Sequence, residues 1–502
     1  MTGCYGDPIA RTPTIDRLAG GGAVFNAAYC ASPICCPCRA AMMTARHVHT
    51  IEVWDNASPL RSDWPTFAHA FRAAGYRTVL CGKMHFVGPD QLHGFEERWV
   101  SDIYPASFEW TRSNRHGAAI NDGGQTLRSV LAAGPGETED MHYDELTIRR
   151  AVAGLPALLG GDRPFLLVVS ITGPHFPFNA PSAYWDMFDG VKIPLPVFPK
   201  DFRAREHPYV GWVRSSGGFG EPVPAEVCIR ARRAIYGRMA LVDHHLKQIV
   251  AALERQAAMA STVFAFTSDH GDMMGEHGLW FKNTAFDASS RVPLIVSGPG
   301  IQRGRIDETV SLLDLGPTLA GLAGIPPLDV PSDGRDHAPL LRGERSQECG
   351  QAVIENYGEG LHYGVRTIVR GGHKLNVCAN TPLELFDLHR DPGEWDNVAE
   401  HPRNASIVKD LLRSLAAVSP EPQRYDELRW LSEERRLAIL AAVPPAQRPA
   451  WRDDWRKEFQ DTFGRPPVVD QPSPGFPDPF APATPGEFWP AQDDSSARSQ
   501  PM

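Results

Sequence analysis

Four short apolar runs constrain the fold of this chain more than any other feature of its sequence. Helix-like patterns at 65–76, 144–160 and about 226–255 are interspersed with these runs, which read RTVLCG (77–82), PFLLVVSI (164–171), STVFAFTSDHGD (261–272) and RVPLIVSGPG (291–300). Continuous apolar runs of strand length alternate with helices when a parallel sheet is covered on both faces. We therefore predict an α/β fold in which helices sandwich a mostly parallel sheet.

Polar clusters follow the predicted strands at the point where each apolar run ends. They read GKMH (82–85), TGPHFP (172–177) and SDHGD (268–272). In open α/β sheets, ligands bind at the carboxyl ends of the strands. The three clusters therefore predict one functional site at that edge.

The pattern changes after about residue 350. The runs QAVIENY, GVRTIVR and GHKLNVC are typical of short strands joined by turns, and a helix is expected from about Ala405. The last residues are rich in Pro, Ser and Asp. We predict a large α/β domain at 1–345, a smaller α+β subdomain with an antiparallel sheet at 346–464, and a Pro-rich tail at 465–502.

Composition excludes several classes of partner. The net charge is -10 and no long basic run occurs, which argues against nucleic acid or an anionic membrane as the main partner. The chain shows no signal-peptide pattern, and its longest apolar stretch is too short to cross a bilayer. The nine cysteines are an odd number, so we expect mostly reduced thiols and a cytoplasmic protein. A homo-oligomer is compatible with the sequence.

A cysteine cluster stands in SPICCPCRAAMMTAR (32–46). Cys35 and Cys38 match C-x-x-C, a spacing used by redox pairs at helix N-termini. A zinc knot would recruit His47 and His49, which a helix through residues 38 to 46 would carry away from the thiols. A third interpretation is that one cysteine is converted chemically. The residue pattern alone leaves all three open.

The third interpretation accounts for the most residues, because Cys35-x-Pro37-x-Arg39 followed by Thr44-x-Arg46 resembles the sulfatase signature. In that family a formylglycine-generating enzyme oxidises the first cysteine. Further blocks similar to the family occur in order over roughly residues 8 to 320, namely GKMHFVG, TGPHFPF and TSDHGDMMGEHGLWFK. The segments GKMHFVGPDQLHGFEER and SDIYPASFEW look most like choline sulfatases. The resemblance implies an alkaline-phosphatase-like fold.

The resemblance also implies a role for each matching residue. Formylglycine made from Cys35 would attack sulfur, and His85 would help to collapse the resulting hemiacetal. His175, aided by Lys282, would protonate the leaving alcohol. Three cationic side chains would neutralise charge on the sulfuryl oxygens, and two further residues would bind a metal, expected to be Ca²⁺ with Mn²⁺ or Mg²⁺ as alternatives: Arg39, Lys83 and Lys282, then Asp269 and His270. Without the resemblance, such lysines and histidines are as readily surface charges or core residues.

The sequence departs from the family pattern at two places. Relatives have a metal-binding strand before the segment that begins this chain, MTGCYGDP. We expect either that the true start lies upstream of Met1, which is the interpretation we favour, or that the sheet and the metal site lack this strand. In the expected choline pocket, Trp110 can form one wall by cation–π contact and Asn121 is the only polar remnant.

The sequence therefore predicts an enzyme that hydrolyses a small alkyl or aryl sulfate. Two alternatives remain at this stage. One is a phosphonate monoester or phosphodiester hydrolase, because the same site would stabilise related oxyanions. The other is a non-catalytic relative that binds an anion or a partner protein without a complete metal site.

Overall fold

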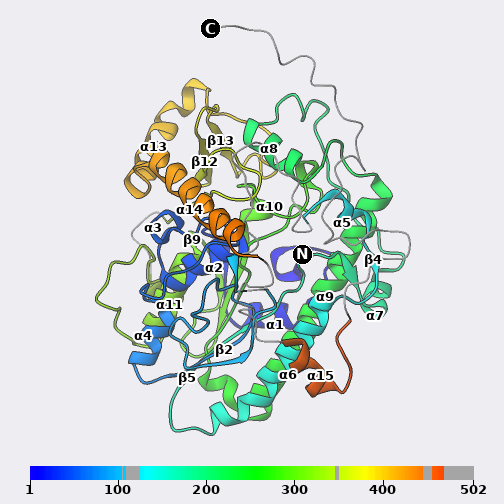
Figure 1. Ribbon diagram of the computed structural model, residues 1–502, viewed down its shortest axis with the longest axis vertical. Coiled ribbons are helices and arrows are strands. Elements are labelled where there is room, and N and C mark those ends of the chain that lie inside the picture. Colours follow the sequence, from blue (N-terminus) through cyan, green and yellow to red (C-terminus); the bar gives the residue numbers. More distant parts are fainter. Residues whose placement is uncertain (105, 109–124, 345–349, 445–454, 469–502) are drawn as a thin grey trace.

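The computed structural model describes residues 1–104, 106–108, 125–344, 350–444 and 455–468. Figure 1 shows helices packed on both faces of a central group of strands, with a separate sheet beside them. The helices are α1 (Pro13–Gly21), α2 (Cys35–Thr44), α3 (Val48–Ile51), α4 (Phe67–Ala73), α5 (Leu127–Leu131), α6 (Glu139–Leu159), α7 (Ser182–Trp185), α8 (Pro208–Ser216), α9 (Ala225–Arg255), α10 (Asp287–Ser290), α11 (Leu315–Leu322), α12 (Ala338–Leu341), α13 (Ala405–Val418), α14 (Pro422–Ala442) and α15 (Trp455–Phe463). Among them, none combines the length and apolar composition needed to span a bilayer.

A first sheet has four strands in the order β7-β8-β1-β9. Their bounds are β1 (Ala23–Tyr29), β7 (Phe264–Thr267), β8 (Arg291–Ser297) and β9 (Gly304–Ser311). Strand β1 is parallel to β9, whereas β8 is antiparallel to both β1 and β7. This departs from the expected parallel arrangement, because the loop that joins β7 and β8 contains short helical segments, a 3₁₀ turn at Glu276–Gly278 and α10, and no crossover helix. Antiparallel neighbours need no crossover helix.

A second sheet has three parallel strands in the order β3-β2-β5, namely β2 (Arg77–Gly82), β3 (Glu97–Val100) and β5 (Phe165–Ser170). The predicted strands at 77–82 and 164–171 are confirmed. Helix α6 packs on all three strands and α4 packs on β2. Helix α6 begins earlier than the predicted residue 144, because Glu139 and Asp140 occupy its first turn, where the helix dipole favours acidic residues. A two-stranded pair, β4 (Gly134–Pro135) with β6 (Asn179–Ala180), lies against α9.

The C-terminal part forms the antiparallel sheet that the sequence predicts, with consecutive pairing of β10 (Gln351–Asn356), β11 (Val365–Arg370), β12 (His373–Cys378) and β13 (Glu384–Asp387). Apolar side chains of its strands pack against Leu411 and Leu415 of α13. Strand β10 also contacts β9, so this sheet adjoins the first one. Helix α13 begins at Ala405, as predicted.

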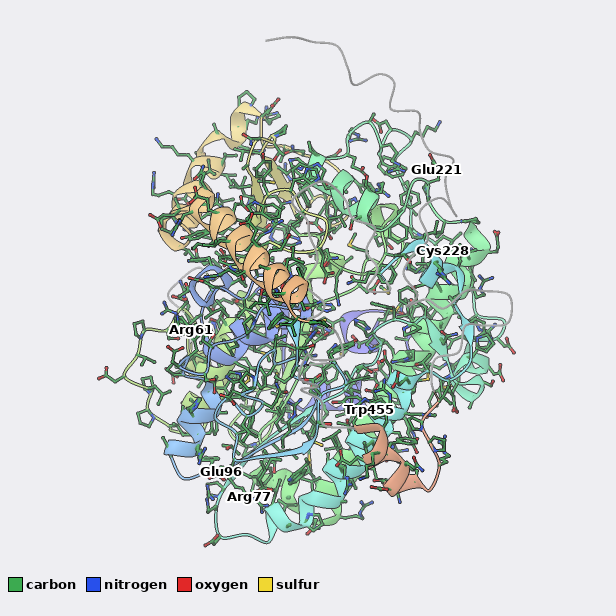
Figure 2. All side chains as sticks on the ribbon, in the orientation of Figure 1. Arg61, Arg77, Glu96, Glu221, Cys228 and Trp455 are labelled. Atoms are coloured by element: carbon green, nitrogen blue, oxygen red, sulfur yellow. The ribbon has the colours of Figure 1, made fainter. Side chains whose placement is uncertain are left out.

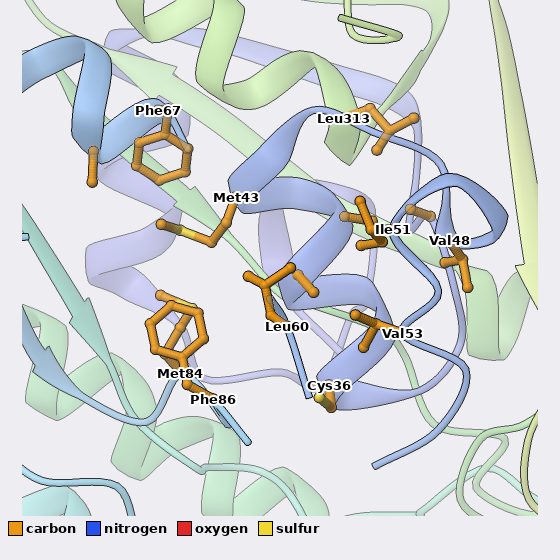
Figure 3. Packing of buried hydrophobic residues seen from close by; sticks show 14 of the residues in the cluster. Cys36, Met43, Val48, Ile51, Val53, Leu60, Phe67, Met84, Phe86 and Leu313 are labelled. Carbon is orange, nitrogen blue, oxygen red and sulfur yellow. The ribbon is translucent and has the colours of Figure 1, made fainter. Parts of the chain in front are cut away.

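Helix α2 is anchored in the largest apolar cluster. Figure 3 shows Met43 of this helix among Leu60, Phe67 and Leu313, with Cys36 at its other end. Deleting a buried side chain of this kind costs about 2–5 kcal/mol, so the packing fixes the helix firmly. Trp455 on α15, which is labelled in Figure 2, packs edge-on against Tyr143 of α6.

Strands β5 and β7 each have one edge with no strand partner among the described residues. Both are only half-buried, and both line a cavity of about 1210 Å³ that lies between them. Other walls come from apolar residues of α6 and α9, such as Leu155 and Leu246. The domain boundaries at 345 and 464 stay predictions.

A buried polar pair joins α3 to the C-terminal sheet. The ring of His49 lies 2.8 Å from a carboxylate oxygen of Glu355 on β10, which is fully buried. Tyr357 and Ser419 donate hydrogen bonds to the same carboxylate. Burial by itself raises the pKa of Glu355, but the hydrogen bond and charge of His49 outweigh it and lower the pKa to about 2.

This pair predicts acid sensitivity. Because the folded pKa of Glu355 lies below its ordinary value of 4.5, its contribution to stability is full above pH 4.5 and is lost as the pH falls toward 2. Urea unfolding should show that Glu355→Gln lowers the free energy of unfolding most at pH 6, with a shrinking difference from wild type toward pH 3. The surface variant Glu254→Gln, which removes an exposed pair with Arg17, should show a small and constant difference. A difference for Glu355→Gln that does not change with pH would contradict this assignment.

Candidate active site

Cys35 is the first residue of α2, and its side chain is 1% exposed. Strand β1 delivers the chain to this point, and Ile34 is still extended before the helix begins. The N-terminus of a helix carries a partial positive charge and favours a neighbouring anion. The local fold therefore places this side chain at the carboxyl end of β1, in a position that stabilises negative charge.

Three cationic or ring groups surround the thiol. The Nζ atom of Lys282 lies 2.9 Å from Cys35 Sγ, Nε2 of His270 lies 3.1 Å away, and Nζ of Lys83 lies 3.8 Å away. Burial by itself raises the pKa of the Cys35 thiol, but Lys282, Lys83 and His270 reverse this and hold the pKa well below its usual value. The structure thus brings these predicted residues, from the segments that follow β1, β2 and β7, to one atom.

His175 lies beside Lys282, on the loop that follows β5. Its Nε2 is 3.3 Å from Lys282 Nζ, and its Nδ1 donates to the carbonyl of Phe176. Burial, followed by the charge of Lys282, lowers the pKa of His175 to about 3. The imidazole is therefore neutral, and its Nε2 accepts a hydrogen bond from the Lys282 ammonium group. Asp144 of α6 holds the loop by accepting hydrogen bonds from the backbone N–H groups of Thr172 and Gly173.

Arg39 has a different environment from the one its predicted role suggests. Its Nε forms an ion pair with Asp269 at 2.7 Å, and its Nη1 donates to the carbonyl of Lys83 and to Ser170 Oγ. The guanidinium therefore ties together the ends of β7, β2 and β5. The positive charge of Arg39 lies close to Cys35, but its Nε and Nη1 groups already donate to protein acceptors. Contact between Arg39 and a sulfuryl group stays a prediction.

The predicted metal ligands Asp269 and His270 follow β7 directly. Their ligand atoms and Cys35 Sγ all lie within 4.8 Å of one another. Burial raises the pKa of Asp269, but the charge of Arg39 outweighs it and leaves the carboxylate ionised. His270 donates Nδ1–H to the Gly271 carbonyl, which leaves its Nε2 lone pair facing the cluster. These donors fit a divalent cation.

Lys83 and His85 come from the turn after β2. Lys83 Nζ stands 4.7 Å from the centre of the Tyr104 ring, in a cation–π arrangement, and the ring of His85 lies 4.8 Å from the same ring. Tyr104 also faces His175 at 6.3 Å. Sequence reasoning missed Tyr104 as a site residue, and its only signal was an aromatic residue shortly after a strand.

Sequence reasoning also missed a carboxylate beside Lys282. Glu359, on the loop after β10, accepts hydrogen bonds from three side-chain amides, those of Asn56, Gln125 and Asn283. Its charge raises the pKa of Lys282, in addition to the larger effect of Cys35 and against the effect of burial. Nothing in its local sequence marked it, because its partners come from distant parts of the chain.

The remaining sequence hypotheses have clear outcomes. Cys36 packs in the same apolar cluster as Met43, and Cys38 packs in a different apolar cluster with Cys30, so the thiols do not form one redox or metal group. All described cysteines are free. His49 binds Glu355 rather than a metal cluster. Trp110 and Asn121 lie outside the described residues.

Comparison with known proteins agrees with this geometry. Residues 1–325 match the Sulfatase family profile, and residues 275–421 match the profile of the N-sulphoglucosamine sulphohydrolase C-terminal region. The choline-sulfatase of Rhizobium meliloti (strain 1021) is 37% identical over 447 residues, covering 86% of each chain. Arylsulfatase K of Danio rerio is 29% identical, covering 86% of this chain and 84% of its own.

A solved structure, the phosphonate monoester hydrolase of Agrobacterium radiobacter, superposes with a TM-score of 0.68 at 24% identity, covering 84% of this chain and 93% of its own. At that identity the likeness shows the fold, which is the alkaline-phosphatase-like architecture expected above. The family profile spans more than half of the chain, and the bacterial relative covers most of it at well over 30% identity. The chain belongs to the sulfatase family of sulfuric ester hydrolases.

Proposed function

We propose that this sulfatase hydrolyses the sulfate ester of a small cationic alcohol such as choline. The observation that supports this choice is Glu359, a partly exposed carboxylate held by three amides next to the Lys282–Asn283 segment. A fixed negative charge that acts on Lys282 attracts a cationic leaving group and repels an anionic one. The similarity to a protein named choline-sulfatase supports the same alcohol.

The nucleophile belongs at position 35. Sulfatases generally use formylglycine and a metal ion, and Cys35 Sγ stands in for the oxygen atoms of the converted side chain. Lys282, Lys83 and the N-terminus of α2 surround this position and stabilise negative charge on the attacking oxygen and on the sulfuryl group. When bound, the metal ion supplies further positive charge to both. We propose Asp269 and His270 as protein ligands, and Ca²⁺ as the ion.

Lys282 and His175 together carry a proton to the leaving alcohol. In the free site the imidazole is neutral and Lys282 donates to its Nε2. Negative charge that develops on the leaving oxygen favours the protonated imidazole, so a proton passes from Lys282 through His175 to that oxygen. We propose that His85, whose ring lies 4.8 Å from that of Tyr104, assists release of sulfate.

Conversion of Cys35 requires a formylglycine-generating enzyme as a partner. Because Cys35 is 1% exposed and Cys36 and Cys38 are also buried, that enzyme must act before α2 packs into the core. We propose the cytoplasm as the location, supported by the free state of the described cysteines.

Substrate preference is tested by comparing choline sulfate, 4-nitrophenyl sulfate and a phenylphosphonate monoester. We expect choline sulfate to have the highest kcat/KM. Glu359→Gln should lower that value about tenfold, corresponding to about 1.4 kcal/mol, while the aryl sulfate, which has no cationic group on its alcohol part, serves as the internal control and changes little. Faster turnover of the phosphonate would favour phosphonate hydrolysis, and an equal loss for both sulfates would remove Glu359 from alcohol recognition.

The nucleophile is tested by peptide mass spectrometry with activity assays. We expect Cys35 to be recovered as the aldehyde, and Cys35→Ala to lose activity by about a thousandfold or more. Cys38→Ala is the matched control, because that thiol lies on the same helix in a separate apolar cluster. The aldehyde and activity should both persist in this control. An unconverted thiol at position 35 in fully active protein would show that formylglycine is not the nucleophile.

The metal site is tested by thermal unfolding with and without Ca²⁺. Binding to the folded state alone raises the melting temperature, so the wild type should gain several degrees on Ca²⁺ addition and lose them on chelation. Asp269→Ala should abolish the gain, whereas Asp63→Ala, which removes an exposed carboxylate paired only with Arg61, should retain it. A full Ca²⁺ response in Asp269→Ala would show that the ion binds elsewhere.

A further inference from the structure

A carboxylate outside the reacting group organises the turn that carries Lys83 and His85. Asp102 follows β3 and is 9% exposed. Its Oδ2 accepts hydrogen bonds from the backbone N–H of Met84 at 2.8 Å and from that of His85, and its Oδ1 accepts from the backbone N–H of Tyr104 at 3.2 Å. One side chain therefore binds both segments that line this side of the site.

We propose that Asp102 is a positioning residue for sulfate ester hydrolysis, fixing Lys83, His85 and Tyr104 in their working arrangement. This inference rests on the sulfatase activity and extends it to a residue that touches neither the nucleophile nor the metal ligands.

The turn after β2 needs such a clamp because its backbone is strained. His85 has φ +61°, in the left-handed region that is unfavourable for a residue with a Cβ atom, whereas Gly82, at φ +97°, adopts its conformation without that cost. Consecutive N–H groups that converge in such a turn form a concave donor site for an anion. The carboxylate of Asp102 fills that site from within the protein and so compensates for the strain.

The clamp also sets the geometry of the cationic side chain. Lys83 is held from one side by Arg39, which donates to its carbonyl oxygen, and from the other by the Asp102-bound turn. Tyr104, whose backbone Asp102 also binds, presents its ring to Lys83 Nζ at 4.7 Å. A shift of Asp102 would therefore move both partners of the cation–π contact at once.

Arg98 keeps the clamp charged. Its Nη2 lies 2.9 Å from Asp102 Oδ2, and Nη1 donates to Gln91. Burial raises the pKa of Asp102, but Arg98 and His85 outweigh it and lower the pKa, so the carboxylate remains an acceptor for all of its donors. The buried ion pair between Arg98 and Asp102 therefore stabilises a turn that has no regular secondary structure of its own.

The test compares Asp102→Asn with Asp243→Asn. Asp243 is a matched control because it is also buried and also accepts consecutive backbone N–H groups, those of Thr14 and Ile15 at the start of α1, away from the site. With 4-nitrophenyl sulfate, and rates normalised to the measured aldehyde content at position 35, we expect Asp102→Asn to lower kcat at least tenfold with KM changed less than threefold. Asp243→Asn should keep kcat within twofold despite a similar loss of melting temperature.

A second readout does not depend on activity. Hydrogen exchange followed by mass spectrometry should show faster exchange of the amides in peptide 82–86 for Asp102→Asn and unchanged exchange there for Asp243→Asn. If the wild type failed to hydrolyse the ester, the proposed function would be wrong, but the exchange measurement would still test whether Asp102 fixes the turn after β2. Unchanged exchange and unchanged kcat in Asp102→Asn would overturn the proposal.

If Asp102→Asn does not fold, Asp102→Glu tests the positioning role of Asp102 instead. It keeps the charge opposite Arg98 but displaces the carboxylate by one methylene, so kcat should fall more than threefold with faster exchange in the same peptide. Wild-type kcat and wild-type exchange in Asp102→Glu would overturn the proposal equally.

Discussion

The site depends on the ion pair and hydrogen bonds that the buried guanidinium of Arg39 forms. The catalytic groups come from two sheets that share no strand pairing in the described structure. Arg39 lies on α2 and forms an ion pair with Asp269, which follows β7 of the first sheet. Its guanidinium also donates to Lys83 and Ser170 at the ends of β2 and β5 in the second sheet. A planar, permanently charged fork with several donors can satisfy carboxylate, carbonyl and hydroxyl acceptors together, which a lysine cannot.

Several charged side chains are buried close to Arg39, although burial of a charge is normally unfavourable. Two lysines lie within 3.8 Å of one sulfur atom, and their mutual repulsion is offset by the ionised Asp269 and, farther out, by Glu359. The balance leaves a surplus of positive potential at position 35. Such a surplus suits a reaction in which negative charge grows on both the attacking and the leaving oxygen.

Local sequence predicted the parts of this arrangement that depend on local rules. Strands β2 and β5, the long helix α9 and the C-terminal sheet follow from apolar runs, and polar residues after each run marked the strand ends. Strand direction is not encoded in apolar periodicity, so the antiparallel placement of β8 was not foreseen. Tyr104, Glu359 and Asp102 escaped notice because their importance comes from partners distant in sequence. The roles of the matching lysines and histidines came from family resemblance rather than from spacing.

The cavity between β5 and β7 has a mechanical consequence. Its volume is about 1210 Å³, and part of it opens to solvent, so the half-buried edges of both strands border this space. Because no strand pairing joins the two sheets among the described residues, side-chain contacts such as those of Arg39 connect them. The reacting groups lie at strand ends of both sheets, so any shift of one sheet relative to the other changes the spacing of those groups.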